Sequence, residues 1–367
     1  MLPTLPPEIL DLIVDHLRDE PIALKSCCLV SKSWVSRARR HLFARIEFIP
    51  VQRPVQLWTS LFPDPFDSPG HHTRSVMFSY LVSIMAASAG GPTWVHHFCN
   101  VEELQVTNVL SIHSIPVSFF QLHGISPTLK SLRLYNTSAR LSEVFNLICS
   151  FPLLEDLRLQ LLTAWGDADG WEIPATSPKL TGSLYLADPI PSIVRGLLDL
   201  PNGLHFAEIT ALRPFGDAEP LVELISRCSA TLEYLHISYN PSAHRPLNLS
   251  KTTRLGELKF ECTGLTVEWI TATLRSAQYT TLRKITIVVS DRSMVIDPVE
   301  EAIRREWQDL DHLLDQLWTS RSVCPEITYK ERRVANGLGE LVLSLLPKLA
   351  GKGAVAGVGV YTRRSEW

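Results

Sequence analysis

One apolar pattern recurs along most of this 367-residue chain and limits what it can fold into. The pattern reads apolar-x-x-apolar-x-apolar, as in "LKSLRL" and "LEDLRL", and its alternating end is typical of a half-buried strand. Its copies, of which the fourth and fifth are weaker, begin at Val101, Leu129, Leu154, Leu180, Leu204, Leu232, Leu255 and Leu282. Successive copies begin 28, 25, 26, 24, 28, 23 and 27 residues apart. A period of this length indicates an array of stacked supersecondary units.

Helix-length apolar segments lie between these strand-like phrases. They are "LSEVFNLICSF", "SIVRGLLDL", "PLVELISRC" and "EWITATLRSA". One strand and one helix per unit predict an α/β solenoid, or horseshoe, with a parallel inner sheet, because strands joined by helical crossovers run parallel. The period and the apolar positions resemble those of leucine-rich-repeat proteins. The resemblance is to a degenerate array over residues 75–367, which "TRSVMFS" opens.

The last 70 residues depart from this rhythm. Residues 297–320 predict a long amphipathic helix with Trp307, Leu310, Leu314 and Leu317 along one side. The three segments after it, "PEITYKER", "GLGELVLSLLPKLAGKG" and "AVAGVGVYT", predict strand, helix and strand. Since a terminal unit must cover the end of the core, we interpret this region as irregular C-terminal repeats or a cap.

The N-terminus is organised differently, with three short helical segments in about 45 residues. The first, "LPPEILDLIVDHL", begins with a proline that the first helical turn tolerates, and it is apolar on two faces. Such a unit is small for independent stability, so it is either a helical cap on the following domain or a module that docks on a partner. Residues 48–74 are predicted to be a linker or N-terminal cap.

The first 47 residues resemble an F-box. "LPPEILDLIVDHL" followed by "ALKSCCLVSKSWVSRARRHLF" matches nearly the whole motif in order and spacing, with Pro21 as a mild departure. F-box, connector, degenerate repeats and a late long helix together are similar to the large F-box families of mushroom-forming fungi. The resemblance implies docking on a Skp-family adaptor, and through it on a cullin–RING ligase. The adaptor-binding residues it implies are Leu5, Pro6, Ile9, Leu10, Ile13, Leu17, Leu24, Leu29, Val30, Trp34 and Leu42.

A second candidate surface is the inner face of the predicted array, where side chains beside the last apolar residue of each strand would project. These candidate substrate-binding residues are Arg133, Tyr135, Arg158, Gln160, Tyr185, His236, Lys259 and Lys284. Arg and Tyr are enriched at binding hot spots, which favours an acidic or phosphorylated protein guest. The competing interpretation is that strand positions facing water are polar in any case.

Bulk properties restrict the function classes. A net charge of −3 argues against nucleic acid as a partner, and no apolar run is long enough to span a membrane. Seven cysteines without C-x-x-C spacing indicate reduced thiols in a cytoplasmic or nuclear protein. The paired histidines at 71–72 and 96–97 and the calcium-like "DADG" at 167–170 lack the geometry of a metal site. No catalytic motif is present, so we expect no catalytic residue, metal or cofactor.

The resemblance to an F-box protein implies a substrate receptor of a Skp–cullin–F-box ubiquitin ligase, with an unidentified protein as its target. The alternative is a protein-binding scaffold that pairs with the adaptor but recruits no cullin. A third possibility, an enzyme within the array, would require a deep polar pocket with a strongly perturbed carboxylate or histidine.

Overall fold

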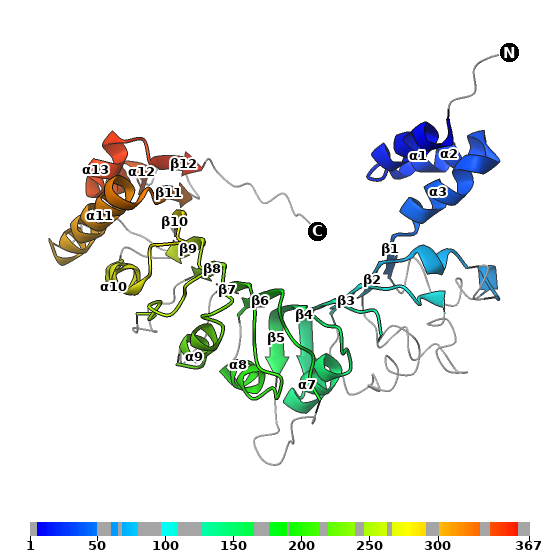
Figure 1. Ribbon diagram of the computed structural model, residues 1–367, viewed down its shortest axis with the longest axis horizontal. Coiled ribbons are helices and arrows are strands. Elements are labelled where there is room, and N and C mark those ends of the chain that lie inside the picture. Colours follow the sequence, from blue (N-terminus) through cyan, green and yellow to red (C-terminus); the bar gives the residue numbers. More distant parts are fainter. Residues whose placement is uncertain are drawn as a thin grey trace. The chain divides into compact units, whose positions relative to one another are not determined.

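The computed structural model divides into two compact units, Met1–Lys179 and Leu180–Trp367 (Figure 1). The structure describes residues 6–49, 60–64, 68–79, 97–108, 127–164, 176–188, 191–212, 219–238, 246–262, 266–290, 301–330 and 338–358. Both units are α/β, as predicted. The boundary between the units lies within the region for which the sequence predicted a single array.

The first unit begins with three helices, α1 (Pro7–His16), α2 (Pro21–Val30) and α3 (Lys32–Leu42). Proline is the first residue of both α1 and α2, where its missing N–H has no helical acceptor to lose. The Ser31 hydroxyl accepts a hydrogen bond from the Ser33 N–H and caps α3. A small core holds the helices together, and its members are Val14, Leu24, Cys27 and Ala38, with Leu17, Cys28, Trp34 and Leu42 packed against them.

Five parallel strands complete the first unit, each paired in register with the next along the chain. They are β1 (Arg45–Phe48), β2 (Ser75–Ser79), β3 (Glu103–Thr107), β4 (Ser131–Ala139) and β5 (Asp156–Ala164). The 3-10 helix η2 (Pro69–His72) precedes β2, and α7 (Leu141–Cys149) follows β4. Alternate residues of the strands are buried, and a stack of Phe48 on Phe78 continues that core through β1 and β2.

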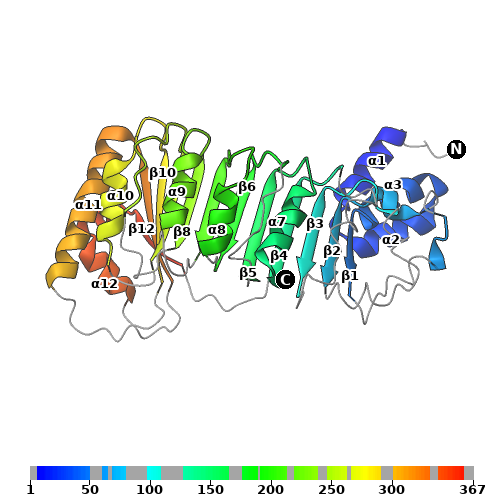
Figure 2. The same cartoon turned by 90° about the horizontal axis from the view of Figure 1, so that it is seen from below.

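The second unit repeats the strand–helix order. Its parallel strands are β6 (Ser183–Ala187), β7 (Glu208–Leu212), β8 (Tyr234–Ser238), β9 (Glu257–Cys262), β10 (Lys284–Ser290), β11 (Cys324–Lys330) and β12 (Val355–Val358). Its crossover helices are α8 (Pro191–Leu198), α9 (Glu219–Arg227) and α10 (Glu268–Ser276). Figure 2 shows these three helices over one face of the strands. Among the described residues, no helix covers the other face of β6–β10 (Figure 1).

All eight predicted strand phrases form strands or lead into one. Their first apolar residues, from Val101 to Leu282, are at most 4% exposed, because each lies a few residues before its strand and points into the core. The four predicted helices between them are α7, α8, α9 and α10. The pattern therefore located the elements correctly, including the two weak copies.

The C-terminal region contains the long helix α11 (Glu301–Arg321), with Trp307, Leu310, Leu314 and Leu317 buried as predicted. The single helix predicted after it is wrong: two helices form, α12 (Leu338–Leu345) and α13 (Pro347–Gly351). Pro347 explains the break, because proline has no N–H for the preceding turn. The carboxylate of Asp311, buried in α11, accepts hydrogen bonds from the N–H groups of Lys348 and Leu349 at 3.1 Å each.

Three residues with a left-handed backbone conformation lie at the end of β3 and within β4 and β5. Asn108, Asn136 and Leu161 have φ between 49° and 56°, and the register aligns Asn136 with Leu161. The Asn136 amide donates to the Asn108 side-chain oxygen at 2.7 Å. In the second unit, Asp188 has the same conformation just after β6. No described helix is both long and apolar enough to cross a membrane.

Candidate functional site

The helices at the start of the first unit expose an apolar surface. Its members are at least 39% exposed, and they are Ile9, Leu12, Ile13, Ile22, Leu29 and Val30. Leu29 is 89% exposed and Ile22 80% exposed, although both are large aliphatic side chains. We call these six residues the helical apolar surface. Six of the ten large aliphatic side chains that are exposed among the described residues belong to α1 and α2, and this concentration makes the two helices a candidate interface.

The structure separates the predicted docking residues into two groups. Ile9, Ile13, Leu29 and Val30 belong to the helical apolar surface, whereas Leu24 is 1% exposed and cannot contact a partner in this conformation. Leu17, Trp34 and Leu42 pack against the same core as Leu24. Pro6 is exposed and Leu10 is half-buried, while Leu5 lies outside the described residues.

The prediction of docking residues also omitted two members of the surface. Leu12 and Ile22 are more exposed than Ile9, yet neither was assigned to docking. The signal was available for Leu12, because α1 has apolar residues on both faces and its inner position is occupied by Val14. Ile22 is an aliphatic residue in the first turn of α2, two residues before the buried Leu24, and this position could have indicated that it is exposed.

A charged cluster holds α1 against α3 beside this surface. The Arg37 guanidinium donates two hydrogen bonds to the Asp15 carboxylate, at 2.7 and 2.5 Å, and His41 Nε2 lies 2.7 Å from the same carboxylate. Hydrogen bonds from Arg37 and His41 hold the pKa of Asp15 well below its usual range. The cluster fixes the packing of two helices that the small core alone supports weakly.

In the first unit, the predicted strand-face residues form rows across β3, β4 and β5. Register places Arg133 beside Arg158, and Tyr135 beside Gln160. Arg133 is bound to Glu103 on the neighbouring strand, with Nε and the carboxylate oxygen 3.0 Å apart. Because this ion pair offsets the charge of Arg133, the support for an anionic guest at this arginine is weaker than the sequence suggested.

In the second unit, two rows of side chains cross the face opposite the helices. The first row runs from β6 to β11 as Ser183, Glu208, Tyr234, Glu257, Lys284 and Cys324. The second row runs in the same order as Tyr185, Thr210, His236, Lys259, Thr286 and Glu326. We call these two rows the strand-face rows.

The predicted residues of this unit fall into both rows. Tyr185, His236 and Lys259 belong to the second row, and Lys284 belongs to the first. Lys284 is bound to Glu326, with Nζ and the carboxylate oxygen 2.7 Å apart, and this hydrogen bond raises its pKa. His236 Nε2 lies 4.0 Å from the carboxylate of Glu261.

The predicted positions did not include the acidic residues of these rows, namely Glu208, Glu257 and Glu326. Those positions were only the ones beside the last apolar residue of each phrase. The side-chain period of two would have found the missing positions, because the residue two places earlier in a strand lies on the same face.

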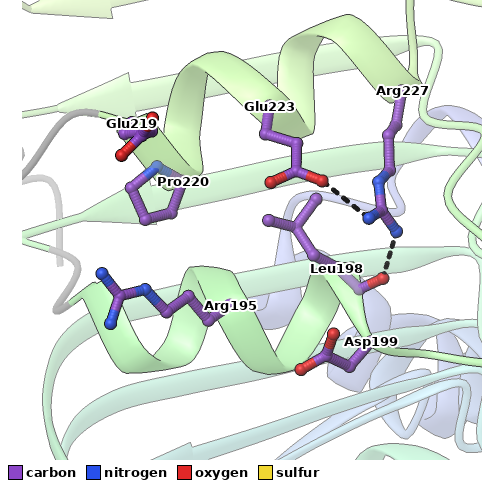
Figure 3. Close-up of a pocket in the computed structure, with 7 residues that line it drawn as sticks. All are labelled: Arg195, Leu198, Asp199, Glu219, Pro220, Glu223 and Arg227. Atoms are coloured by element: carbon purple, nitrogen blue, oxygen red, sulfur yellow. Dashed lines mark hydrogen bonds and ion pairs between the residues drawn. The ribbon is translucent and has the colours of Figure 1, made fainter.

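A hollow of about 300 Å³ lies between α8 and α9 (Figure 3). Arg227 donates to the Leu198 carbonyl and to Glu223, so it links the end of α8 to α9. The remaining lining residues are Arg195, Asp199, Glu219 and Pro220. The lining carries both positive and negative side chains, and Arg227 is held by its contacts with the two helices. We therefore interpret the hollow as the gap between two packed crossover helices.

Within the described residues, the other candidate sites from the sequence show no assembled chemistry. No described group of three or more His, Cys, Asp or Glu side chains is arranged to hold a metal. His71 Nδ1 lies 3.0 Å from Cys99 Sγ, and the buried His97 is 3% exposed. The calcium-like segment and His96 lie outside the described residues.

Comparison with known proteins does not identify a family. No protein-family model matches the chain, and no curated protein matches it. Function must therefore be argued from the two surfaces themselves.

Proposed function

We propose that this protein is a substrate receptor of a Skp–cullin–F-box ubiquitin ligase. In this proposal the N-terminal helices are an F-box that docks on a Skp-family adaptor. The strands and helices that follow are a degenerate leucine-rich-repeat array that holds a protein target. The observation that carries the proposal is the helical apolar surface, together with the resemblance of its sequence to the F-box motif.

Burial supports this assignment of roles within the helices. The module has a core of its own, so Ile22, Leu29 and Val30 are not needed to close it. Burying an aliphatic side chain of this size contributes about 1.5–3 kcal/mol. Stable interfaces generally have an apolar centre within a polar rim. The exposed aliphatic side chains of α1 and α2 are of the type expected at such a centre.

The strand-face rows supply the second part of the proposal. In the second unit they are largely polar and partly exposed, and no described helix covers them over β6–β10 (Figure 1). A rigid parallel sheet with an open polar face can present a target without contributing chemistry. The proposed role is therefore proximity. Holding a target beside an enzyme that carries ubiquitin raises the effective concentration of the target's lysines at that enzyme.

A pull-down with a purified Skp-family adaptor tests the docking role. The test variant is Ile22→Glu/Leu29→Glu, which places two charges in the helical apolar surface. The matched control is Leu153→Glu/Leu343→Glu, at two aliphatic residues that are 52% and 40% exposed elsewhere. We expect the native chain and the control to retain the adaptor, and the test variant to lose it.

Two results would distinguish the alternatives. A folded native chain that does not bind the adaptor would overturn the F-box assignment and leave the helices as a cap. Adaptor binding without co-purification of a cullin would instead favour the non-ligase scaffold.

A further inference from the structure

The strand-face rows of the second unit carry a charge pattern that the sequence analysis did not anticipate. Residues Glu208, Tyr234 and Glu257 lie side by side in the first row, on β7, β8 and β9. Neighbouring strands are about 4.8 Å apart, so a carboxylate-bearing residue flanks the tyrosine on each side. Both glutamates are exposed and Tyr234 is half-buried.

The two glutamates form no hydrogen bond or ion pair with a described residue, although Lys284, the neighbour of Glu257 on β10, interacts with it electrostatically. Glu326, in contrast, forms an ion pair with Lys284. Exposed carboxylates of this kind keep their charge available for an incoming partner. Their side chains also remain free to reorient toward a cation.

Tyr234 lies in the negative electrostatic potential of these two carboxylates. Burial raises the pKa of its hydroxyl, and the carboxylates of Glu257 and Glu208 raise it further, whereas the nearby Lys284 lowers it to a smaller extent. An aromatic ring attracts a cation placed over its face, and ammonium and guanidinium groups both use this contact. A ring between two carboxylates therefore combines two attractions for the same kind of group.

The wider face has the same sign. Within the two strand-face rows, the carboxylates are Glu208, Glu257 and Glu326, and the lysines are Lys259 and Lys284. The ion pair with Glu326 offsets the charge of Lys284. The same ion pair neutralises Glu326, so Glu208 and Glu257 remain against Lys259, and this acidic excess disfavours the acidic or phosphorylated guest considered from the sequence.

We propose that Glu208, Tyr234 and Glu257 anchor a lysine- or arginine-bearing segment of a protein partner on the open strand face. The inference rests on the proposed function, since it takes this face as the surface that receives the target. An extended basic segment lying across the strands places one cationic side chain over Tyr234, within reach of a carboxylate on either side.

Fluorescence anisotropy with the full chain tests this proposal. The probes are a fluorescein-labelled GSGKGRGKGSG peptide, its acidic counterpart GSGEGEGEGSG, and the same acidic peptide with phosphoserine replacing the central glutamate. We expect the basic peptide to bind, with an affinity that falls as salt is raised, and the other two not to bind. Preferred binding of either acidic peptide would overturn the proposal.

Matched charge variants locate the site. The test variant is Glu208→Gln/Glu257→Gln, and the control is Asp309→Asn/Glu340→Gln, which removes the same charge from exposed positions on α11 and α12. We expect the test variant to weaken basic-peptide binding about tenfold and the control to change it less than about twofold. Equal losses in both variants would show attraction to net charge alone and would refute a site.

Two substitutions of the ring separate its role from that of the carboxylates. Tyr234→Phe keeps the aromatic face and is expected to bind nearly as well as the native chain, whereas Tyr234→Leu is expected to bind several-fold more weakly. Equal binding by both would remove the tyrosine from the proposal.

The same samples are tested in the adaptor pull-down, so that the two proposals can fail separately. Loss of peptide binding with intact adaptor binding rejects this inference and leaves the docking role. Peptide binding without adaptor binding rejects the ligase role and leaves a receptor for basic segments.

Discussion

Replacing Asp311 with alanine is expected to release α13 from α11. The carboxylate is 2% exposed and accepts hydrogen bonds from two backbone N–H groups, of Lys348 and Leu349, at 3.1 Å each. Leu349 is itself fully buried, so its N–H cannot turn to water when the acceptor is removed. A buried donor left without an acceptor costs about 1–3 kcal/mol.

Lys348 is exposed, so the loss of its hydrogen bond adds only about 1 kcal/mol, and the expected total loss is about 2–4 kcal/mol in the local free energy of unfolding. Asp311→Asn keeps one acceptor oxygen in place, so its expected loss is about half of that. The charge-matched control is Asp309→Ala, because Asp309 is exposed on the same helix. We expect the control to change local stability by less than about 0.5 kcal/mol.

Hydrogen–deuterium exchange of the peptide that covers residues 346–354 is the suitable assay, since it reports local opening without assuming that the whole chain unfolds in one step. Each 1.4 kcal/mol is a tenfold change, so Asp311→Ala should accelerate exchange there by about thirtyfold to several hundredfold. Exchange within about threefold of the native rate, or equal acceleration by Asp311→Asn, would refute the capping role.

Three further predictions follow from the described contacts. Asp15→Asn should lower the melting temperature at neutral pH, because it removes the link between α1 and α3. Since the folded state holds the pKa of Asp15 below its ordinary value of 3.8, the difference from the native chain should shrink as pH falls below about 4. Iodoacetamide followed by peptide mass mapping should label the exposed Cys324 at pH 8 and leave Cys262 unmodified, because burial raises the pKa of Cys262 to about 12. Gly70→Ala should destabilise the first unit by about 1–3 kcal/mol in thermal or urea unfolding, because an added Cβ would meet the His97 carbonyl oxygen at 2.4 Å, whereas Gly351→Ala has open space and should not.

The period of the apolar pattern predicted most of the fold because it is a local signal. Each phrase buries its own apolar residues, so Leu180 and Leu204 could be placed even where the motif is weak. The exposed side chains of the N-terminal helices were predicted in part, since α1 has more apolar surface than a small core can cover. Leu24, which was predicted to contact the adaptor, is buried in the core of the helices, and sequence spacing alone does not distinguish the inner face of α2 from the outer one.

The remaining features depend on contacts between residues far apart in the chain. Asp311 lies among the apolar residues of α11, and its acceptor role exists only because Pro347 ends one helix and begins another 36 residues later. The acidic character of the strand face depends on the register that places Glu208 beside Tyr234 and Glu257. Nothing in the sequence predicts the left-handed conformation of Leu161, because leucine rarely adopts it. Asn108 and Asn136, which share this conformation, are of a residue type that tolerates it.

The in-register parallel pairing within each unit has a consequence for how the chain folds. Paired residues on successive strands are close in sequence, as for Glu103 and Ser131 or Tyr234 and Glu257. Parallel sheets usually require long loops to close before any contact forms, which makes their folding slow. Here a typical separation of about 26 residues in a chain of 367 corresponds to a relative contact order near 0.07, in the range of helical bundles. Each strand can therefore pair soon after its own segment leaves the ribosome, and structure can spread from one neighbour to the next while the C-terminal helices are still being synthesised.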